Sequence, residues 1–265
     1  MRVFDLLGTI VPDDDALLYR WFGFTVTSPK DMREAIKKAG KEPMKVRINS
    51  YGGDVWSASE MYTMLRQHEP GVEVEVTGLA ASAATVVMTA GNRVRASPTS
   101  EIMIHNPSTH ADGDHRIMEQ TAESLKNTRE TIVNAYELKT GMSREKLRGM
   151  MNAATWMTAQ RAKEKGFVDE IMFTEAEGLK DEPEEATGSG AGTARTASMN
   201  MPSASELRAK WAVWNEIAPG SESIDEARAR LAGGQEETIP RKEDRETQDQ
   251  RARALILEQI RTLGT

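Results

Sequence analysis

One serine in the chain stands where a nucleophile could be held. The stretch VTGLAASAATVVMTAGNRV, residues 76–94, surrounds Ser82 with residues that have almost no side chain. A β-rich segment precedes Ser82 and an apolar run follows it, which predicts a strand-to-helix turn whose free N–H groups favour negative charge. The small neighbours leave the hydroxyl unobstructed, as in nucleophile-elbow sequences. On this stretch alone, a serine that merely caps a core helix is the commoner interpretation.

Two further stretches supply groups that such a nucleophile needs. In NSYGGDVWSA, residues 49–58, paired glycines leave backbone amides uncovered, which suits an oxyanion donor as well as a tight turn. In EIMIHNPS, residues 101–108, His105 stands at a predicted strand end, and histidine is best suited to take a proton from a serine near neutral pH. Each piece alone is more often structural. The other histidines, His68, His110 and His115, are predicted to be solvated.

The elements that must position these residues alternate between β-rich and helical patterns up to about residue 173. This repetition with short connections predicts an α/β fold with a largely parallel sheet, in which ligands meet the turns after the strands. The predicted strands are 2–11, 44–50, 72–78, 92–97, 101–106 and 167–173. The predicted helices are 28–39, 54–68, 82–90, 113–140, 143–151 and 158–165.

After residue 173 the composition changes. Residues 174–203 are rich in Glu, Gly, Ser, Ala and Thr, which predicts a flexible acidic linker. Residues 204–265 predict a helical tail with narrow apolar stripes, which needs a partner chain or self-association to be stable. Trp211 and Trp214 share a helical face, so the tail is interpreted either as a solvated extension or as a scaffold-like binding module.

Composition excludes several classes of function. The chain has 265 residues and no cysteine, which removes disulfides, thiolate metal sites and cysteine nucleophiles. A net charge of −7 without a basic stripe argues against a nucleic-acid surface, and no apolar stretch approaches the roughly 20 residues of a membrane span. Without a metal motif, a nucleotide motif or a signal-peptide pattern, we expect no cofactor and a cytoplasmic protein.

The order and spacing of the three stretches are more specific than any one of them. A GG turn ending at Gly53, then Ser82 about 29 residues on in GLAAS, then His105 a further 23 residues on, resembles the Clp-type serine peptidases. AYELKTGMSREKLRGMM (135–151) and TWMTAQRAKEKGFVDEI (155–171) are similar to later segments of that family, so the resemblance covers roughly residues 1–173. The short Ser82–His105 spacing and the IHNPS and TWMTA wording resemble the phage head-maturation, or prohead protease, branch.

The resemblance implies a fold, a mechanism and an assembly. It implies a ClpP/crotonase-like fold of repeated β-β-α units, with Ser82 as nucleophile, His105 as general base, and the N–H groups of Gly53 and Ala83 as the oxyanion hole. It also implies a ring-shaped homo-oligomer, with a heptamer or a stacked double ring as candidate assemblies. The phage branch implies cleavage of capsid or scaffold proteins, or of the chain's own tail, inside the assembling head. Because the sequence has no nucleotide motif, we expect this chain to act without ATP.

One part of the family pattern is missing. The third catalytic residue, an acid, normally lies about two residues before the aromatic that here is Trp156, and that position holds Ala154. Three alternatives remain: Asn152 orients His105 by a hydrogen bond, Asp169 reaches the site, or a slow Ser/His dyad operates.

Two rival functions fit parts of the sequence. A degradative ClpP-type subunit working with a separate AAA+ unfoldase would carry hydrophobic docking pockets and no long tail. A catalytically silent shell or scaffold protein would keep the fold without the reaction, and Ala154 is the residue that favours it.

Overall fold

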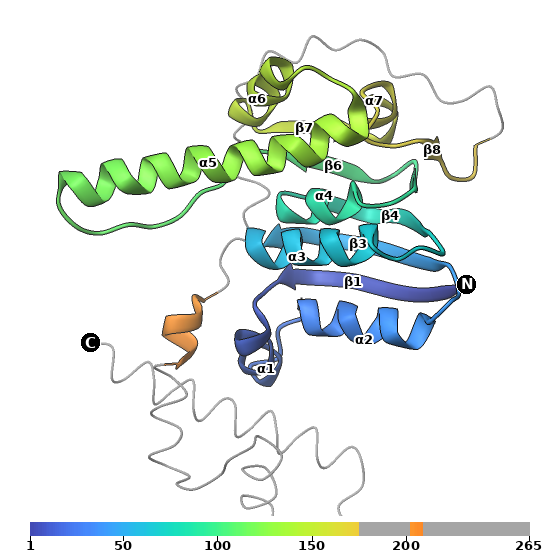
Figure 1. The fold of residues 1–265 in the computed structure, drawn as a ribbon, viewed down its shortest axis with the longest axis horizontal. Helices are drawn as coiled ribbons and strands as arrows, with labels where there is room; N and C mark the ends of the chain where they lie inside the picture. The colour runs from blue at the N-terminus through green and yellow to red at the C-terminus, as the bar shows by residue number, and fades with distance from the viewer. Residues whose placement is uncertain (175–201, 209–265) are drawn as a thin grey trace, which may run out of the picture. The chain divides into compact units, whose positions relative to one another are not determined.

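The computed structural model describes residues 1–174 and 202–208. Residues 1–174 build one eight-stranded sheet in the order β2-β1-β3-β4-β5-β8, with β6 paired to β4 and β7 paired to β6 (Figure 1). The strands are β1 (Arg2–Ile10), β2 (Val26–Thr27), β3 (Met44–Gly53), β4 (Val72–Ala81), β5 (Arg93–Ala96), β6 (Glu101–Ile104), β7 (Thr155–Thr158) and β8 (Glu170–Ile171). Every pairing is parallel except that of β6 with β7, which confirms the predicted α/β fold with a largely parallel sheet.

The helices of residues 1–174 lie between these strands. They are α1 (Asp13–Trp21), α2 (Pro29–Ala39), α3 (Val55–Arg66), α4 (Ala83–Met88), α5 (His115–Thr140), α6 (Arg144–Asn152) and α7 (Ala159–Glu164). Their starts follow local capping chemistry: the Asp54 carboxylate accepts from the Ser57 N–H at 2.7 Å, and Asp114 accepts from the first turn of α5. Of the residues that the model describes, none belongs to a helix long and apolar enough to cross a membrane.

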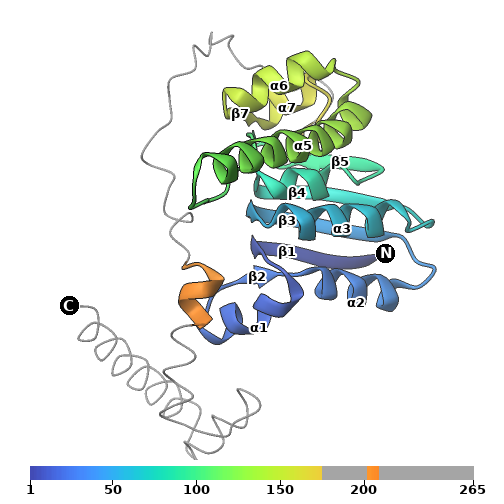
Figure 2. The same ribbon diagram turned by 60° about the vertical axis from the view of Figure 1, so that its left-hand side comes forward.

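The core lies on one face of the sheet. Alternate side chains of β3 and β4, among them Val46, Ile48, Val74 and Val76, are fully buried, and α3 and α4 lie over this face (Figures 1 and 2). Parallel sheets are normally covered on both faces. Here the opposite face carries an ion-pair network across the strands instead, formed by Asp5, Lys45, Arg47, Glu73, Glu75, Arg95 and Glu170.

Helix α5 has two unlike halves. Its second half buries Ile132, Val133 and Tyr136, whereas its first half extends beyond the edge of the sheet (Figure 1). Ile117 and Met118 lie exposed on that first half. A helix half with unburied apolar side chains lacks the packing that normally stabilises it, which favours a contact with another chain.

Several predicted elements need correction. Helix α1 and strand β2 were not predicted, although the three aspartates after Pro12 suit a first helical turn. Strand β7 was also not predicted, because four residues form a strand only by pairing with β6. The predicted strand 167–173 was too long: the N–H groups of Phe167 and Val168 bond the Ala162 carbonyl and close α7, which leaves only β8.

The predicted linker and tail lie almost wholly outside the described residues. Residues 204–208 are helical, and Ser203 and Glu206 form their capping box: the Ser203 N–H donates to the Glu206 carboxylate at 2.6 Å, and the Glu206 N–H donates to Ser203 Oγ at 3.2 Å. Trp211 and Trp214 fall outside the described residues, so the interpretation of the tail as a binding module stays a prediction.

Candidate active site

Ser82 occupies a sharp turn between β4 and α4. Its backbone has φ 53° and ψ −127°, a conformation that residues with a side chain rarely adopt and that costs about 1–3 kcal/mol. The turn is held by neighbouring backbone: the Ser82 N–H donates to the Met103 carbonyl at 2.9 Å, and the Thr85 N–H donates to the Ser82 carbonyl at 2.9 Å. A strained serine at a strand-to-helix turn is the geometry of a nucleophile elbow.

His105 meets this serine from the adjacent strand. Because β6 runs parallel to β4 with Met103 beside Ala81, His105 emerges at the same edge of the sheet as Ser82. The His105 Nε2 atom lies 2.7 Å from Ser82 Oγ, a hydrogen-bond distance. Burial lowers the pKa of His105, so the ring is neutral at pH 7 and can accept the hydroxyl proton.

The glycine turn packs directly against the start of α4. Gly52 has φ 95°, and a Cβ built on it would lie 2.8 Å from both the Ala83 nitrogen and Ser82 Cβ. Gly53 has φ 144°, and a Cβ there would lie 2.1 Å from the Ile10 carbonyl oxygen. Only glycine therefore permits this close approach. As the first residue of α4, Ala83 has an N–H without an intrahelical acceptor, which is the type of donor that an oxyanion hole uses.

The residues weighed for the third catalytic position have other partners. Asn152 accepts a hydrogen bond from Asn106 Nδ2 at 2.9 Å, and Asp169 bonds the Val94 N–H at 2.6 Å and Lys139 Nζ at 2.7 Å. Within residues 1–174 and 202–208, the His105 ring has a hydrogen bond to Ser82 alone. The described residues therefore leave the second ring nitrogen, Nδ1, without an orienting group.

Ala154 lies where an orienting group would be needed. The antiparallel pairing of β6 and β7 ends at Ile104 and Thr155, so His105 and Ala154 each stand one residue beyond the last pair, at the same end of the two strands. Ala154 is exposed and has φ 48°, in the left-handed region that disfavours alanine. The position at which the sequence lacks an acid therefore follows the same end of the β6–β7 pairing as the histidine.

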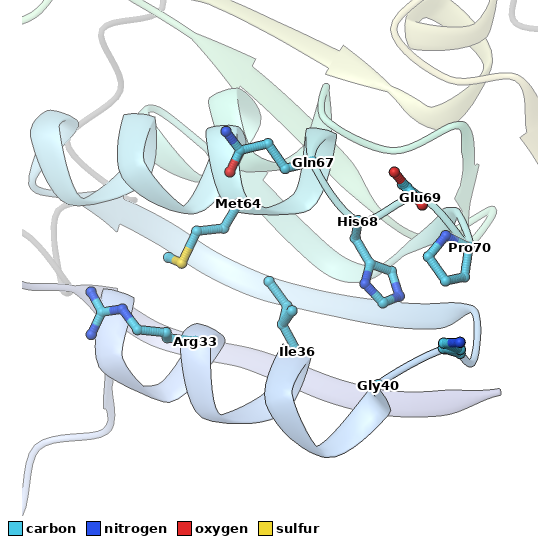
Figure 3. A pocket seen from close by; sticks show the side chains of 9 residues that line it. Arg33, Ile36, Gly40, Met64, Gln67, His68, Glu69 and Pro70 are labelled. Atoms are coloured by element: carbon cyan, nitrogen blue, oxygen red, sulfur yellow. The ribbon is translucent and has the colours of Figure 1, made fainter.

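A groove elsewhere on the surface does not belong to this site. It has a volume of about 780 Å³ and lies between the C-terminal ends of α2 and α3 (Figure 3). Charged Arg33, Lys41 and Glu69 line it together with apolar Met64. His68 also lines it, and the prediction that His68 is solvated is wrong: it is buried, with Nε2 2.9 Å from the Glu42 carbonyl oxygen.

A comparison with protein families agrees with the geometry. The family model described as Clp protease matches residues 34–175, which is more than half of the chain. The matched range runs from within α2 to just beyond β8 and includes the glycine turn, Ser82, His105 and Ala154. On this match, the chain belongs to the Clp protease family.

Proposed function

We propose that this protein is a serine endopeptidase with Ser82 as the nucleophile and His105 as the general base. The observation that carries the proposal is the 2.7 Å contact between His105 Nε2 and Ser82 Oγ at a strained turn. A capping serine in a core helix would need neither a histidine at its hydroxyl nor left-handed backbone dihedrals.

The reaction follows the acyl-enzyme route. His105 Nε2 takes the hydroxyl proton as Ser82 Oγ attacks the peptide carbonyl, and the Gly53 and Ala83 N–H groups stabilise the negative oxygen. The tetrahedral intermediate then expels the amine, which receives the proton from His105 and leaves as the first product. A water molecule, deprotonated in turn by His105, hydrolyses the Ser82 ester and releases the second product. No step requires a metal or a nucleotide.

The substrate and setting that we propose are those of phage head maturation. The protein would cleave scaffold or capsid proteins, or its own tail, without ATP, inside an assembling head in the host cytoplasm. The short Ser82–His105 spacing, the TWMTA segment and the long tail support this proposal. A ring-shaped homo-oligomer fits the Clp protease family, and the exposed Ile117 and Met118 of α5 offer apolar surface for a second copy.

A fluorophosphonate probe tests the proposed nucleophile directly. We expect intact mass and peptide mapping to show one adduct, on Ser82, and none in Ser82→Ala, which should assemble like the parent protein. Cleavage of a co-expressed capsid or scaffold protein should stop in the same variant. Persisting cleavage by Ser82→Ala would show that another residue is the nucleophile.

One rival function is favoured by a specific observation. A silent shell protein would keep the fold without the reaction, and the alanine at position 154, where an acid would be expected, is what supports it. A well-assembled sample that takes up no probe would make this the better account. A degradative subunit would instead be captured by an AAA+ unfoldase in a pull-down.

A further inference from the structure

A buried chain of hydroxyl groups ends on the backbone of Ser82. Thr85, in the first turn of α4, places its Oγ1 2.5 Å from the Ser82 carbonyl oxygen. The same Oγ1 lies 2.6 Å from the hydroxyl oxygen of Tyr136, on α5. Thr85 is 0% exposed and Tyr136 is 1% exposed, so water does not compete for these bonds.

The direction of this chain follows from its last acceptor. A carbonyl oxygen only accepts, so the single hydroxyl proton of Thr85 is donated to Ser82. Thr85 can then only accept from Tyr136, whose hydroxyl is the donor. Burial raises the pKa of Tyr136, so this donor keeps its proton. Its ring packs edge-on against Phe167, with centroids 5.4 Å apart, which fixes where the hydroxyl lies.

We propose that Thr85 and Tyr136 are positioning residues that hold the Ser82 carbonyl and thereby keep the nucleophile in its strained turn. The inference rests on the proposed role of Ser82 as nucleophile. A backbone costing about 1–3 kcal/mol persists only where its surroundings over-determine it. At Ser82 the N–H is held by Met103, on the strand that leads to His105, and the carbonyl is held by Thr85.

Each hydroxyl has a distinct effect in this arrangement. Without the Thr85 hydroxyl, the Ser82 carbonyl keeps only its bond from the Thr85 N–H and can rotate, which moves Oγ relative to His105. Without the Tyr136 hydroxyl, Thr85 loses its donor and its rotamer is less constrained. Neither group touches the peptide, so the rate of the chemical step should fall while substrate binding is kept.

Isosteric variants test the inference. We expect Thr85→Val to slow fluorophosphonate labelling of Ser82, and kcat on a peptide substrate, about tenfold, within the ~10² that a 1 Å misplacement causes, with KM changed less than twofold. Tyr136→Phe should lower the labelling rate and kcat about threefold. Thr85→Ser, which keeps the hydroxyl, should have the rates of the parent protein. Thr89→Val is the matched control, because Thr89 is also buried, caps the opposite end of α4 from Ser82, and donates to the Val86 carbonyl at 2.7 Å.

The outcomes separate this inference from the proposed function. If the parent protein is labelled at Ser82 and Thr85→Val is labelled equally fast, the positioning role is wrong while the nucleophile stands. If Thr89→Val is slowed as much as Thr85→Val, the effect is one of helix stability and the inference is also overturned. An unlabelled parent protein refutes the nucleophile itself, and the positioning role with it. Should Thr85→Val not fold, Tyr136→Phe, which removes one oxygen atom, decides in its place.

Discussion

Replacing Ala154 with aspartate would test whether the missing acid at this position limits the rate of the proposed enzyme. Ile104 and Thr155 form the last pair of β6 and β7, and His105 and Ala154 are the residues next to that pair in the chain, so an aspartate at 154 is placed to test whether a carboxylate reaches the His105 ring. Alanine is held there at φ 48°, and aspartate tolerates this left-handed conformation better. The substitution therefore adds a carboxylate without adding backbone strain.

The size of the gain follows from what an orienting acid contributes. In a complete serine triad, loss of the acid costs on the order of 10⁴ in turnover, which sets the ceiling for Ala154→Asp. Because the surroundings of residue 154 are not built to hold a carboxylate, we expect Ala154→Asp to increase kcat by about 10- to 100-fold. The negative charge should also raise the pKa of His105, whereas burial now lowers it, so the acid limb of kcat/KM should move to higher pH.

Two matched variants isolate the carboxylate in this experiment. Ala154→Gly relieves the left-handed backbone without adding a side chain, and Ala154→Asn adds an acceptor of the same shape without charge. Fluorophosphonate labelling rates and peptide-cleavage kinetics would be measured for all three beside the parent protein. If Ala154→Asp is no faster than Ala154→Gly, and its pH profile does not move, the missing acid at position 154 is not what limits the rate.

Three further predictions concern pH, the glycine turn and assembly. Because burial lowers the pKa of His105, kcat/KM of the parent protein should rise with pH through a midpoint below about 6.5 and be level at neutral pH; a midpoint above 7 would contradict this. Gly52→Ala should abolish labelling and lower the free energy of unfolding by about 1–3 kcal/mol, since its Cβ would meet the Ala81 carbonyl oxygen at 2.6 Å. Gly40→Ala, also at positive φ but in open space, is the control, and equal losses in both would show that the close approach is unimportant. Ile117→Asp should reduce the oligomer mass in mass photometry without shifting the melting temperature, and an unchanged mass would remove the first half of α5 from the assembly contact.

The sequence could predict those parts of the site that depend on residue type and spacing. Ser82 and His105 were singled out because few side chains can serve as nucleophile and base, and the structure places their side chains in hydrogen-bond contact. The parallel sheet that carries them followed from strand and helix periodicity and is confirmed. The Clp protease family followed from the order of the motifs and is confirmed by the family match.

The parts that depend on packing could not be predicted in the same way. Asn152 was considered as a partner of His105, but its side chain bonds Asn106, the residue after His105. A one-residue difference of this kind is set by how α6 packs against α5 and β7. The pairing of Thr85 with Tyr136 joins residues 51 apart in the chain, and neither hydroxyl stands in a motif. Strand β7 was not predicted because its four residues form a strand by pairing with β6 and not through a pattern of their own.

Because the second half of α5 is buried and its first half is not, this helix can move as a rigid rod that pivots at its buried part. If the buried Ile132 is taken as its pivot, the long arm of α5 runs out to His115, and the short arm carries Tyr136 and ends at Thr140. Since a helix rises by a constant 1.5 Å per residue, a sideways displacement of the exposed tip is reduced to about a quarter at Tyr136. In the proposed assembly, a second copy bound at the tip could therefore shift by a few ångströms while Tyr136 moves by less than one, so loose assembly contacts would be compatible with a rigid proposed active site.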